Sequence, residues 1–259
     1  MRWSIVRVPR GRRSIRLVRT GAGEMLVFAN EDVGRLIWLN GVFEASESIF
    51  LEREIRLGDI CIDVGGNIGY FSLLMARCAR KGHVHTFEPI PLNVAMIHLN
   101  TELSGLHNIT INQLALSDED GIVAFSISVD SAYSSMRATG TFSEAQAIAV
   151  RAVRLDQYLA TQQIERIDIV KIDVEGAEEK VLRGGEALFR DPSRRPRLMM
   201  LELYDANLAS YDTTVAQIVE TMQNWGYAPH TVMEDGSALV PLDPAKINAT
   251  YNIFFTPSC

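Results

Sequence analysis

The sequence is poor in cysteine, in long apolar runs and in basic residues beyond its first twenty positions. Its three cysteines, Cys61, Cys78 and Cys259, form no CxxC pair or other metal-ligand spacing, which argues against a zinc ribbon or a disulfide scaffold. No segment approaches the roughly 20 consecutive apolar residues of a membrane-spanning helix, so no transmembrane segment is predicted. No secretory signal is recognisable either, and we therefore expect a reducing, cytoplasmic compartment.

The charge balance argues against broad nucleic-acid binding as the main activity, because the formal net charge is −7. Seven arginines and no acid lie in the first twenty residues, which leaves −14 for the rest of the chain. This basic arm has three interpretations. The first is an edge hairpin of residues 5–8 and 15–18 that turns at Pro9-Arg10-Gly11. The second is a basic patch that binds an anionic acceptor, a membrane surface or a partner. The third is a cleaved transit peptide. A homo-oligomer could form through this N-terminal extension.

The strongest local motif lies in residues 58–75. A strand of alternating buried apolar residues ends at Gly65-Gly66, and from Ile68 apolar side chains recur at helical spacing. A strand, a glycine turn and a helix in this order open a nucleotide-binding βαβ unit. The motif therefore predicts a doubly wound α/β fold with a ligand at the turn.

The turn favours a ligand that is cationic or neutral over a diphosphate. A dinucleotide fingerprint would place a glycine two residues after Gly65, where this chain has Asn67, and Asp63 would repel an anion. The next strand ends at Glu88, whose carboxylate can accept hydrogen bonds from both ribose hydroxyls. An NAD site uses the same device, so the pairing of Asp63 with Glu88 is the more specific signal. S-adenosylmethionine, with its ammonium and sulfonium, fits this pattern.

A second group of charged residues ends a predicted central strand. Lys171, Asp173 and Glu175 alternate, so on a strand they would point to one face, at the edge where doubly wound sheets bind ligands. One interpretation is mutual neutralisation of Lys171 and Asp173; the other is a functional site. Asp173 and Glu175 could supply two oxygen ligands to a metal, with Glu202 or Asp205 as a third. Because Lys171 could replace the charge of a metal, no metal is predicted.

The remaining pattern predicts one α/β domain with N-terminal additions. Residues 1–57 are expected to form a β-hairpin and helical extension that serves as a cap or an interface. Residues 58–259 are expected to form a Rossmann-like domain with a β-loop-β insertion near 121–154. Residues 130–146 of this insertion are a substrate lid or a surface excursion. Leu36, Leu39 and Phe43 could pack over the sheet edge or cover the cofactor, and the sequence leaves both open.

Three blocks of the sequence resemble the hallmark motifs of FkbM-type methyltransferases. They are Asp-Val-Gly-Gly-Asn-Ile-Gly at 63–69, Phe-Glu-Pro-Ile-Pro-Leu-Asn at 87–93 and Lys-Ile-Asp-Val-Glu-Gly-Ala-Glu at 171–178. A further block, Val-Arg-Leu-Asp-Gln-Tyr-Leu at 153–159, is similar to one that usually precedes the third. The resemblance implies a class I Rossmann-like fold with a seven-stranded sheet and helices on both faces. It also implies S-adenosylmethionine-dependent methyl transfer, mostly to hydroxyl oxygens.

Carried over residue by residue, the resemblance implies a set of cofactor-binding residues: Asp63, Gly65, Asn67, Gly69, Glu88, Asn93, Ser117 and Asp173. The expected catalytic residues are Glu175, which contacts the acceptor as a base, Asp173 beside the methionyl end of the cofactor, and Lys171, which keeps Asp173 ionised. The expected reaction is O-methylation of a sugar, a glycan or a secondary metabolite. N-methylation of a small molecule and a non-catalytic cofactor-binding scaffold are the alternatives, and no nucleic-acid partner is expected.

Overall fold

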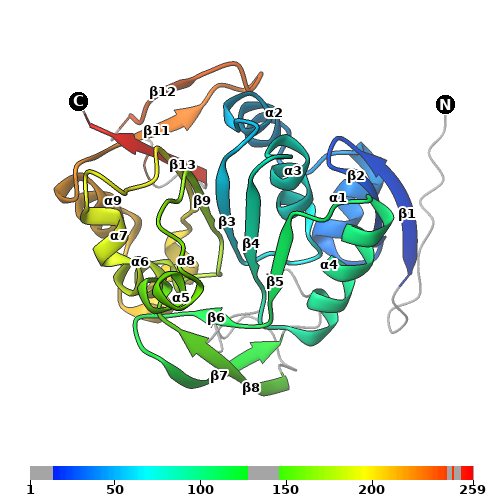
Figure 1. Cartoon of the computed structure of the whole chain (residues 1–259), viewed down its shortest axis with the longest axis horizontal. Helices are drawn as coiled ribbons and strands as arrows, with labels where there is room; N and C mark the ends of the chain where they lie inside the picture. The colour runs from blue at the N-terminus through cyan, green and yellow to red at the C-terminus, as the bar shows by residue number, and fades with distance from the viewer. Residues whose placement is uncertain (1–13, 128–145, 244–246, 248–251, 259) are drawn as a thin grey trace.

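A computed structural model describes residues 14–127, 146–243, 247 and 252–258, and its main sheet has eight strands in the order β12-β11-β13-β10-β9-β3-β4-β5 (Figure 1). The strands are β3 (Ile60–Val64), β4 (His83–Phe87), β5 (Ile109–Asn112), β9 (Ile169–Ile172), β10 (Leu198–Glu202), β11 (Tyr227–Val232), β12 (Leu239–Pro241) and β13 (Asn252–Pro257). The last strand, β13, is inserted antiparallel between β10 and β11. The predicted seven strands gain an eighth, β12, because a turn at Gly236 with φ +66° folds the chain back onto β11.

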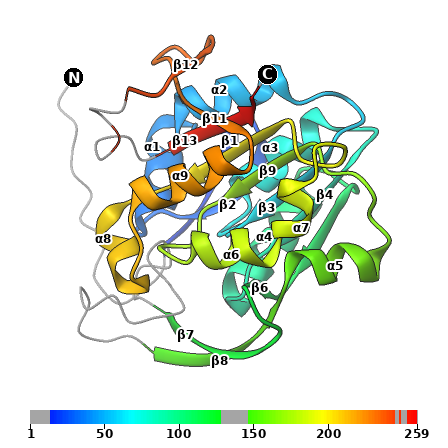
Figure 2. The ribbon, with the colours of Figure 1, turned by 90° about the vertical axis from the view of Figure 1, so that its left-hand side faces the viewer.

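Helices cover both faces of this sheet, which confirms the predicted layering (Figure 2). They are α3 (Tyr70–Cys78), α4 (Pro91–Leu103), α5 (Leu155–Gln162), α6 (Glu178–Gly184), α7 (Glu186–Arg190), α8 (Asp205–Leu208) and α9 (Val215–Asn224). Alternate residues of each strand enter separate cores, because successive side chains of a strand point to opposite faces. Ile62 and Ile172 pack with α5, α6 and α9, whereas Cys61 and Ile169 pack on the face that α3 covers.

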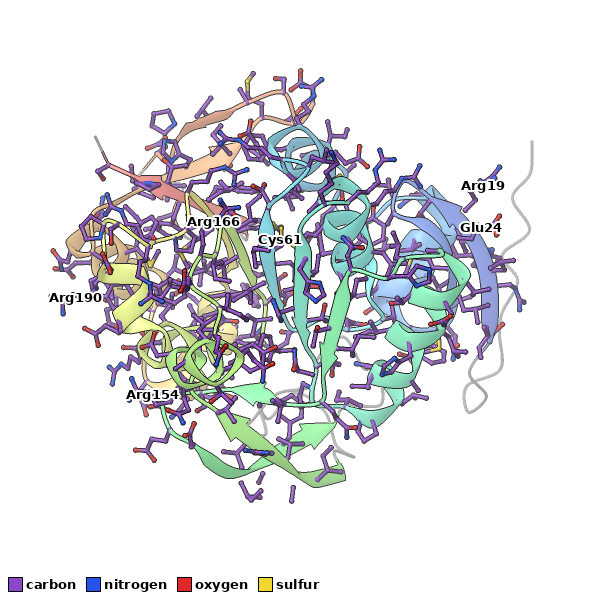
Figure 3. The ribbon with its side chains drawn as sticks, viewed as in Figure 1. Arg19, Glu24, Cys61, Arg154, Arg166 and Arg190 are labelled. Atoms are coloured by element: carbon purple, nitrogen blue, oxygen red, sulfur yellow. The ribbon has the colours of Figure 1, made fainter. Side chains whose placement is uncertain are left out.

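The cysteine in β3 has the buried position that the sequence predicts. Cys61 is fully buried inside the sheet, whereas Arg19, Glu24, Arg154 and Arg190 lie at the periphery of the view (Figure 3). Burial raises the pKa of its thiol far above the usual range, so Cys61 behaves as a small apolar side chain. Among the described helices, none combines the length and the apolar character needed to cross a membrane.

A second, three-stranded sheet has the order β6-β8-β7, with β6 (Ala115–Leu116), β7 (Gly121–Ile127) and β8 (Gln146–Val153). The chain turns after Asn112, and Ala115 and Leu116 then pair with Ala152 and Val153 of β8. The predicted lid falls mostly on residues 128–145, which lie outside the described residues.

The N-terminal segment consists of β1 (Ile15–Thr20), β2 (Gly23–Phe28), α1 (Asp32–Asn40) and α2 (Ala45–Glu54). The described hairpin joins β1 to β2, and the predicted turn at residues 9–11 lies outside the described residues. Asn100 of α4 fixes this segment to the domain, because its side chain accepts from the Leu26 amide at 2.7 Å and donates to the Leu26 carbonyl at 3.1 Å. The same amide group donates to the Ile68 carbonyl, just after the glycine turn, at 2.8 Å.

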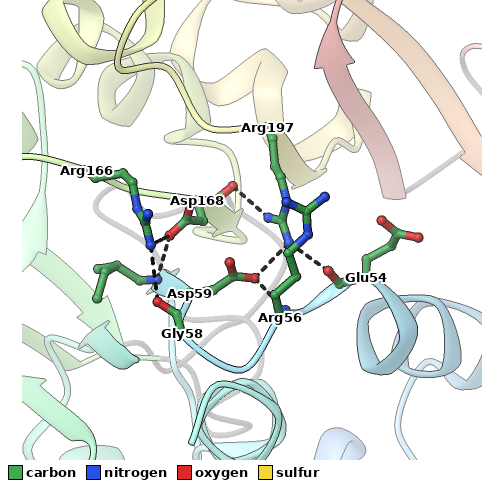
Figure 4. A network of polar contacts seen from close by, with 8 residues as sticks. Glu54, Arg56, Gly58, Asp59, Arg166, Asp168 and Arg197 are labelled. Carbon is green, nitrogen blue, oxygen red and sulfur yellow. Dashed lines mark hydrogen bonds and ion pairs between the residues drawn. The ribbon is translucent and has the colours of Figure 1, made fainter. Parts of the chain in front are cut away.

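A polar network at the amino ends of β3, β9 and β10 sets their register (Figure 4). Arg197 donates to Asp59 and to the Glu54 carbonyl, both at 2.7 Å. Asp168 accepts from the Ile60 amide at 2.8 Å and forms an ion pair with Arg166 at 3.1 Å. These contacts lie at the opposite end of the strands from the glycine turn. They therefore hold three central strands in the alignment that brings their other ends together.

Candidate active site

A cavity of about 250 Å³ lies at the carboxyl ends of the central strands. Its lining comes from the glycine turn, the tips of β4, β9 and β10, the link between β5 and β6, and the N-terminal segment. From the N-terminal segment the lining takes Asp32, Val33, Leu36 and Phe43. The sequence left open where Leu36, Leu39 and Phe43 pack. In the structure Leu36 and Phe43 cover the cavity, whereas Leu39 is 60% exposed and lies outside the lining.

The glycine turn brings the ends of β3 and β9 into direct contact. Gly65 has φ +85°, and a Cβ at this position would lie 1.8 Å from the carbonyl oxygen of Asp173. Only glycine permits both the positive φ and this approach. Asn67 also adopts a left-handed conformation, with φ +48°, which turns its amide towards Glu88. The turn therefore places the end of β9 directly beside the ligand-binding loop.

Glu88 lies in the cavity wall at the tip of β4, as the sequence predicts for a ribose-binding acid. Its two carboxylate oxygens accept hydrogen bonds from the amides of Asn67 at 2.8 Å and Ile90 at 2.9 Å. The Asn93 side chain is a third hydrogen-bond partner, and the remaining lone pair is available to a ligand hydroxyl. Burial raises the pKa of Glu88 to about 7, although both backbone amides stabilise the ionised form.

A buried ion-pair network connects neighbouring strands and consists of Asp63, Lys171 and Asp173. The Nζ atom of Lys171, which is 3% exposed, lies 2.9 Å from Asp173 Oδ2 and 3.8 Å from Asp63 Oδ1. The ring of Phe71 covers the ammonium group, with 5.1 Å between Nζ and the ring centre. Burial raises the pKa of Asp173, but the charge of Lys171 and hydrogen bonds with Glu202 and Lys171 together bring the pKa below its usual value. Asp173 is therefore ionised at neutral pH.

Asp173, Glu175 and Glu202 converge on one point of the cavity, where one carboxylate oxygen of each lies within 4.8 Å of the others. The predicted alternation stops at Ile172, where β9 ends, and a left-handed backbone at Glu175, with φ +56°, brings its carboxylate to the other two. We call Asp173, Glu175 and Glu202 the acid cluster. The alternative ligand, Asp205, lies outside the cavity lining and accepts from the Val215 amide instead.

Crowding of carboxylates changes the protonation of the acid cluster. Burial, and then the charges of Asp173 and Glu178, raise the pKa of Glu175 to about 9. The charge of Asp173, followed by burial, raises the pKa of Glu202 well above its usual value. Crowding thus favours protonation of Glu175 and Glu202 beside an ionised Asp173, and a nearby positive charge would favour loss of these protons.

Glu178 supports the loop that carries Glu175, and the sequence analysis did not single it out. It is 1% exposed, and its Oε1 accepts hydrogen bonds from the amides of Val174 and Gly176, both at 3.1 Å. On the other side of the loop, the Asn207 side chain donates to Glu175 Oε2. The place of Glu178 at the end of the block at 171–178 was the signal in the sequence for this role.

Three predicted cofactor-binding residues lie outside the cavity lining: Gly69, Asn93 and Ser117. Gly69 begins α3 with φ +96°. Asn93 is 1% exposed on α4, and its side chain is hydrogen-bonded to Glu88. The Ser117 hydroxyl donates to Asp118 at 3.0 Å. The structure therefore brings together Asp63, Gly65, Asn67, Glu88, Lys171, Asp173 and Glu175 from the predicted set.

Comparison with known proteins agrees with this geometry. The family model for the methyltransferase FkbM domain matches residues 63–229. The chain belongs to the FkbM methyltransferase family. The matched segment contains the glycine turn, Glu88 and Glu202, but it leaves out the N-terminal segment that covers the cavity.

This FkbM-family chain is similar in sequence to two further proteins and in fold to one solved structure. The 31-O-demethyl-FK506 methyltransferase FkbM of Streptomyces tacrolimicus is 28% identical over 205 residues, which cover 67% of this chain and 74% of that protein. Methyltransferase 1 of Beauveria bassiana is 29% identical over 146 residues, 48% of this chain and 57% of that protein, so the match spans little more than half of its length. The fold is shared with a putative rRNA-methylase from Clostridium thermocellum. The two chains are 9% identical, and the superposition has a TM-score of 0.50 over 84% of this chain and 98% of that one.

The cofactor of the family is S-adenosylmethionine, and the residues of the cavity fit it. The polar groups around the turn are carboxylates, which suit an ammonium, a sulfonium and ribose hydroxyls. Gly65 leaves no room for a side chain between the turn and β9, so a ligand meets bare backbone there. Asp63 Oδ1 is buried and accepts no hydrogen bond from the described residues, although Lys171 lies 3.8 Å away. Asp63, Glu88 and Asp173 are thus the residues that would hold the cofactor.

Proposed function

We propose that this chain transfers a methyl group from S-adenosylmethionine to a hydroxyl oxygen of a small-molecule or glycan acceptor. The observation that carries the proposal is the acid cluster, whose three carboxylates meet within 4.8 Å in the same cavity as the glycine turn. Transfer to an oxygen requires a group that accepts the hydroxyl proton. The name of the relative from Streptomyces tacrolimicus, which describes a 31-O-demethyl substrate, supports oxygen as the accepting atom.

The bound cofactor supplies a methyl group on a positively charged sulfur, a carbon already activated for displacement. Glu88 would accept hydrogen bonds from the ribose hydroxyls, while Asp63 and Asp173, which line the same cavity, would hold the methionyl end. The protein then has to hold the acceptor oxygen in line with the methyl group, about 3 Å away. The contact between the turn and β9 serves this alignment, because it places Asp173 and Glu175 next to the cofactor loop.

Glu175 accepts the hydroxyl proton in this mechanism. Its pKa of about 9 makes the ionised form a stronger base than an ordinary carboxylate, but leaves few molecules ionised at neutral pH. The positive charge of the cofactor lowers that pKa and increases the ionised fraction. Lys171 keeps Asp173 ionised, so a second negative charge remains beside Glu175 and helps to hold the proton.

Transfer of label from methyl-labelled S-adenosylmethionine tests this proposal. The protein is incubated with pooled glycans, alcohols and metabolites, and the labelled product is identified. We expect Glu175→Gln to reduce turnover at least about a hundredfold, the range for loss of a general base. Glu179→Gln is the matched control, because Glu179 pairs with Arg183 at the surface four residues further on. Equal turnover in Glu175→Gln and wild type would overturn the assignment of the base.

A divalent metal is the second candidate for activating the hydroxyl, because three carboxylate oxygens meet in the acid cluster. The buried ammonium of Lys171 already neutralises part of this charge, so we expect EDTA to leave turnover unchanged. If EDTA abolished turnover and magnesium restored it, the metal would take over the role assigned to Glu175. A chain that bound the cofactor but methylated nothing would instead be a scaffold.

A further inference from the structure

We propose that the N-terminal segment selects the acceptor, and that the preferred acceptor is an uncharged polyol whose reacting hydroxyl lies next to an apolar group. This inference rests on the proposed methyl transfer. It identifies Val33, Leu36 and Phe43, which we call the apolar wall, as specificity-determining residues. All three come from α1 and the loop after it, and all three line the cavity.

A series of contacts places the apolar wall on the acceptor side of the cavity. The Phe43 ring meets the rings of Tyr70 and Phe71 edge-on, with 6.1 Å between centres in both cases. The Phe71 ring covers Lys171 Nζ at 5.1 Å, and Lys171 in turn contacts Asp173 of the acid cluster. Phe43 of the apolar wall is therefore three contacts away from the acid cluster, where the proposed mechanism places the acceptor hydroxyl.

The charges of the cavity exclude an anionic acceptor. Lys171 is the only cationic side chain among the described lining residues, and it is 3% exposed and already engaged by Asp63 and Asp173. Asp173 is ionised and only accepts hydrogen bonds, so this member of the acid cluster favours an acceptor that donates them. Neighbouring hydroxyl groups meet this requirement, whereas a carboxylate or phosphate would lie unpaired among like charges.

The apolar wall lies outside the segment that the family model matches. The family match begins at residue 63, after the end of the N-terminal segment. Within the segment, Leu36 is 41% exposed although it lines the cavity, so a substrate could bury a surface that is now in contact with solvent. Burial of this apolar surface would favour an acceptor with an apolar group beside the hydroxyl.

Three matched glucosides test the proposal: methyl β-D-glucopyranoside, hexyl β-D-glucopyranoside and the uronic acid form of the methyl glucoside. We expect kcat/KM for label transfer to be about tenfold higher for the hexyl than for the methyl glucoside, and transfer to the uronic acid to be undetectable. Leu36→Ala should remove most of the preference for the hexyl group. Leu39→Ala is the matched control on the same helix, outside the cavity, and should keep it. Neither variant should change the affinity for S-adenosylhomocysteine, measured by calorimetry.

Each other result counts against the inference. A preference for the methyl or uronic acid form, equal effects of Leu36→Ala and Leu39→Ala, or no transfer to any glucoside would overturn it. In all these cases S-adenosylhomocysteine would still bind, and the proposed cofactor site would stand. Loss of that binding in the wild-type protein would instead overturn the proposed function, and this inference with it.

Discussion

Replacement of Lys171 by methionine should destabilise the protein strongly, and more so at high pH. The substitution removes the ammonium group but keeps a side chain of similar length in a position that is 3% exposed. Asp173, 2.9 Å from Nζ, and Asp63, at 3.8 Å, then lose their buried counter-charge. Removal of one partner of a buried ion pair costs about 3–5 kcal/mol, because an uncompensated charge stays behind.

The pH dependence of this loss follows from the two aspartates. Burial already raises the pKa of Asp63 in the wild-type protein, and without Lys171 the pKa of Asp173 rises as well. The folded variant then binds more protons than the unfolded chain, so its free energy of unfolding falls as the pH rises. The loss relative to wild type should therefore be smaller at pH 5 than at pH 8.

Urea unfolding at both pH values measures this loss. Lys180→Met is the matched control, because Lys180 also contacts an aspartate, Asp118, at 2.8 Å, but its side chain is 36% exposed. An exposed pair contributes at most about 1 kcal/mol, and we expect a loss within this limit that hardly depends on pH. A loss below about 1 kcal/mol for Lys171→Met, or one that is equal at pH 5 and pH 8, would refute the role of Lys171 as the buried counter-charge of Asp63 and Asp173.

Three further predictions concern the cavity and the loop that carries Glu175. Glu88→Ala should weaken the binding of S-adenosylhomocysteine by about 1–3 kcal/mol in calorimetry, the effect of losing hydrogen bonds to a charged group, and an unchanged affinity would place Glu88 outside the site. Wild-type turnover should rise with pH as Glu175 ionises, with a midpoint at or below its pKa of about 9. Glu175→Gln should give a low, flat pH profile. The same rise in this variant would exclude Glu175 as the source of the pH dependence. Glu178→Ala should speed hydrogen exchange of the Gly176 amide at least about tenfold, while Glu178→Gln, which keeps an acceptor oxygen, should protect it; equal exchange in both would remove Glu178 from the support of the loop.

The sequence predicts the parts of the site that depend on local pattern. A strand that ends in glycine, followed by helical spacing, indicates the turn at Gly65, and acids at strand tips indicate Glu88 and Asp173, because the carboxyl ends of parallel strands meet at one edge. The antiparallel insertion of the last strand follows from the same fold. The resemblance to a family extended this to the whole sheet, apart from β12, whose pairing depends on one turn at Gly236.

The remaining features depend on contacts between distant segments, which a periodicity cannot show. Leu36 and Leu39 read alike in the sequence, yet only Leu36 lines the cavity. Glu202 was one of two alternatives for a third acid, and Asp205 is instead held by the Val215 amide. Glu175 joins the acid cluster through a left-handed backbone, not through the alternation of a strand. Asn93 is close in sequence to Glu88, but its burial on α4 leaves it behind the cavity wall.

A crystal structure of the protein with S-adenosylhomocysteine tests the central claim most directly. The account predicts that both ribose hydroxyls lie within hydrogen-bonding distance of the Glu88 carboxylate. It also predicts that the sulfur faces the acid cluster. A ribose bound away from Glu88, or a sulfur directed away from Asp173 and Glu175, would contradict the proposed site.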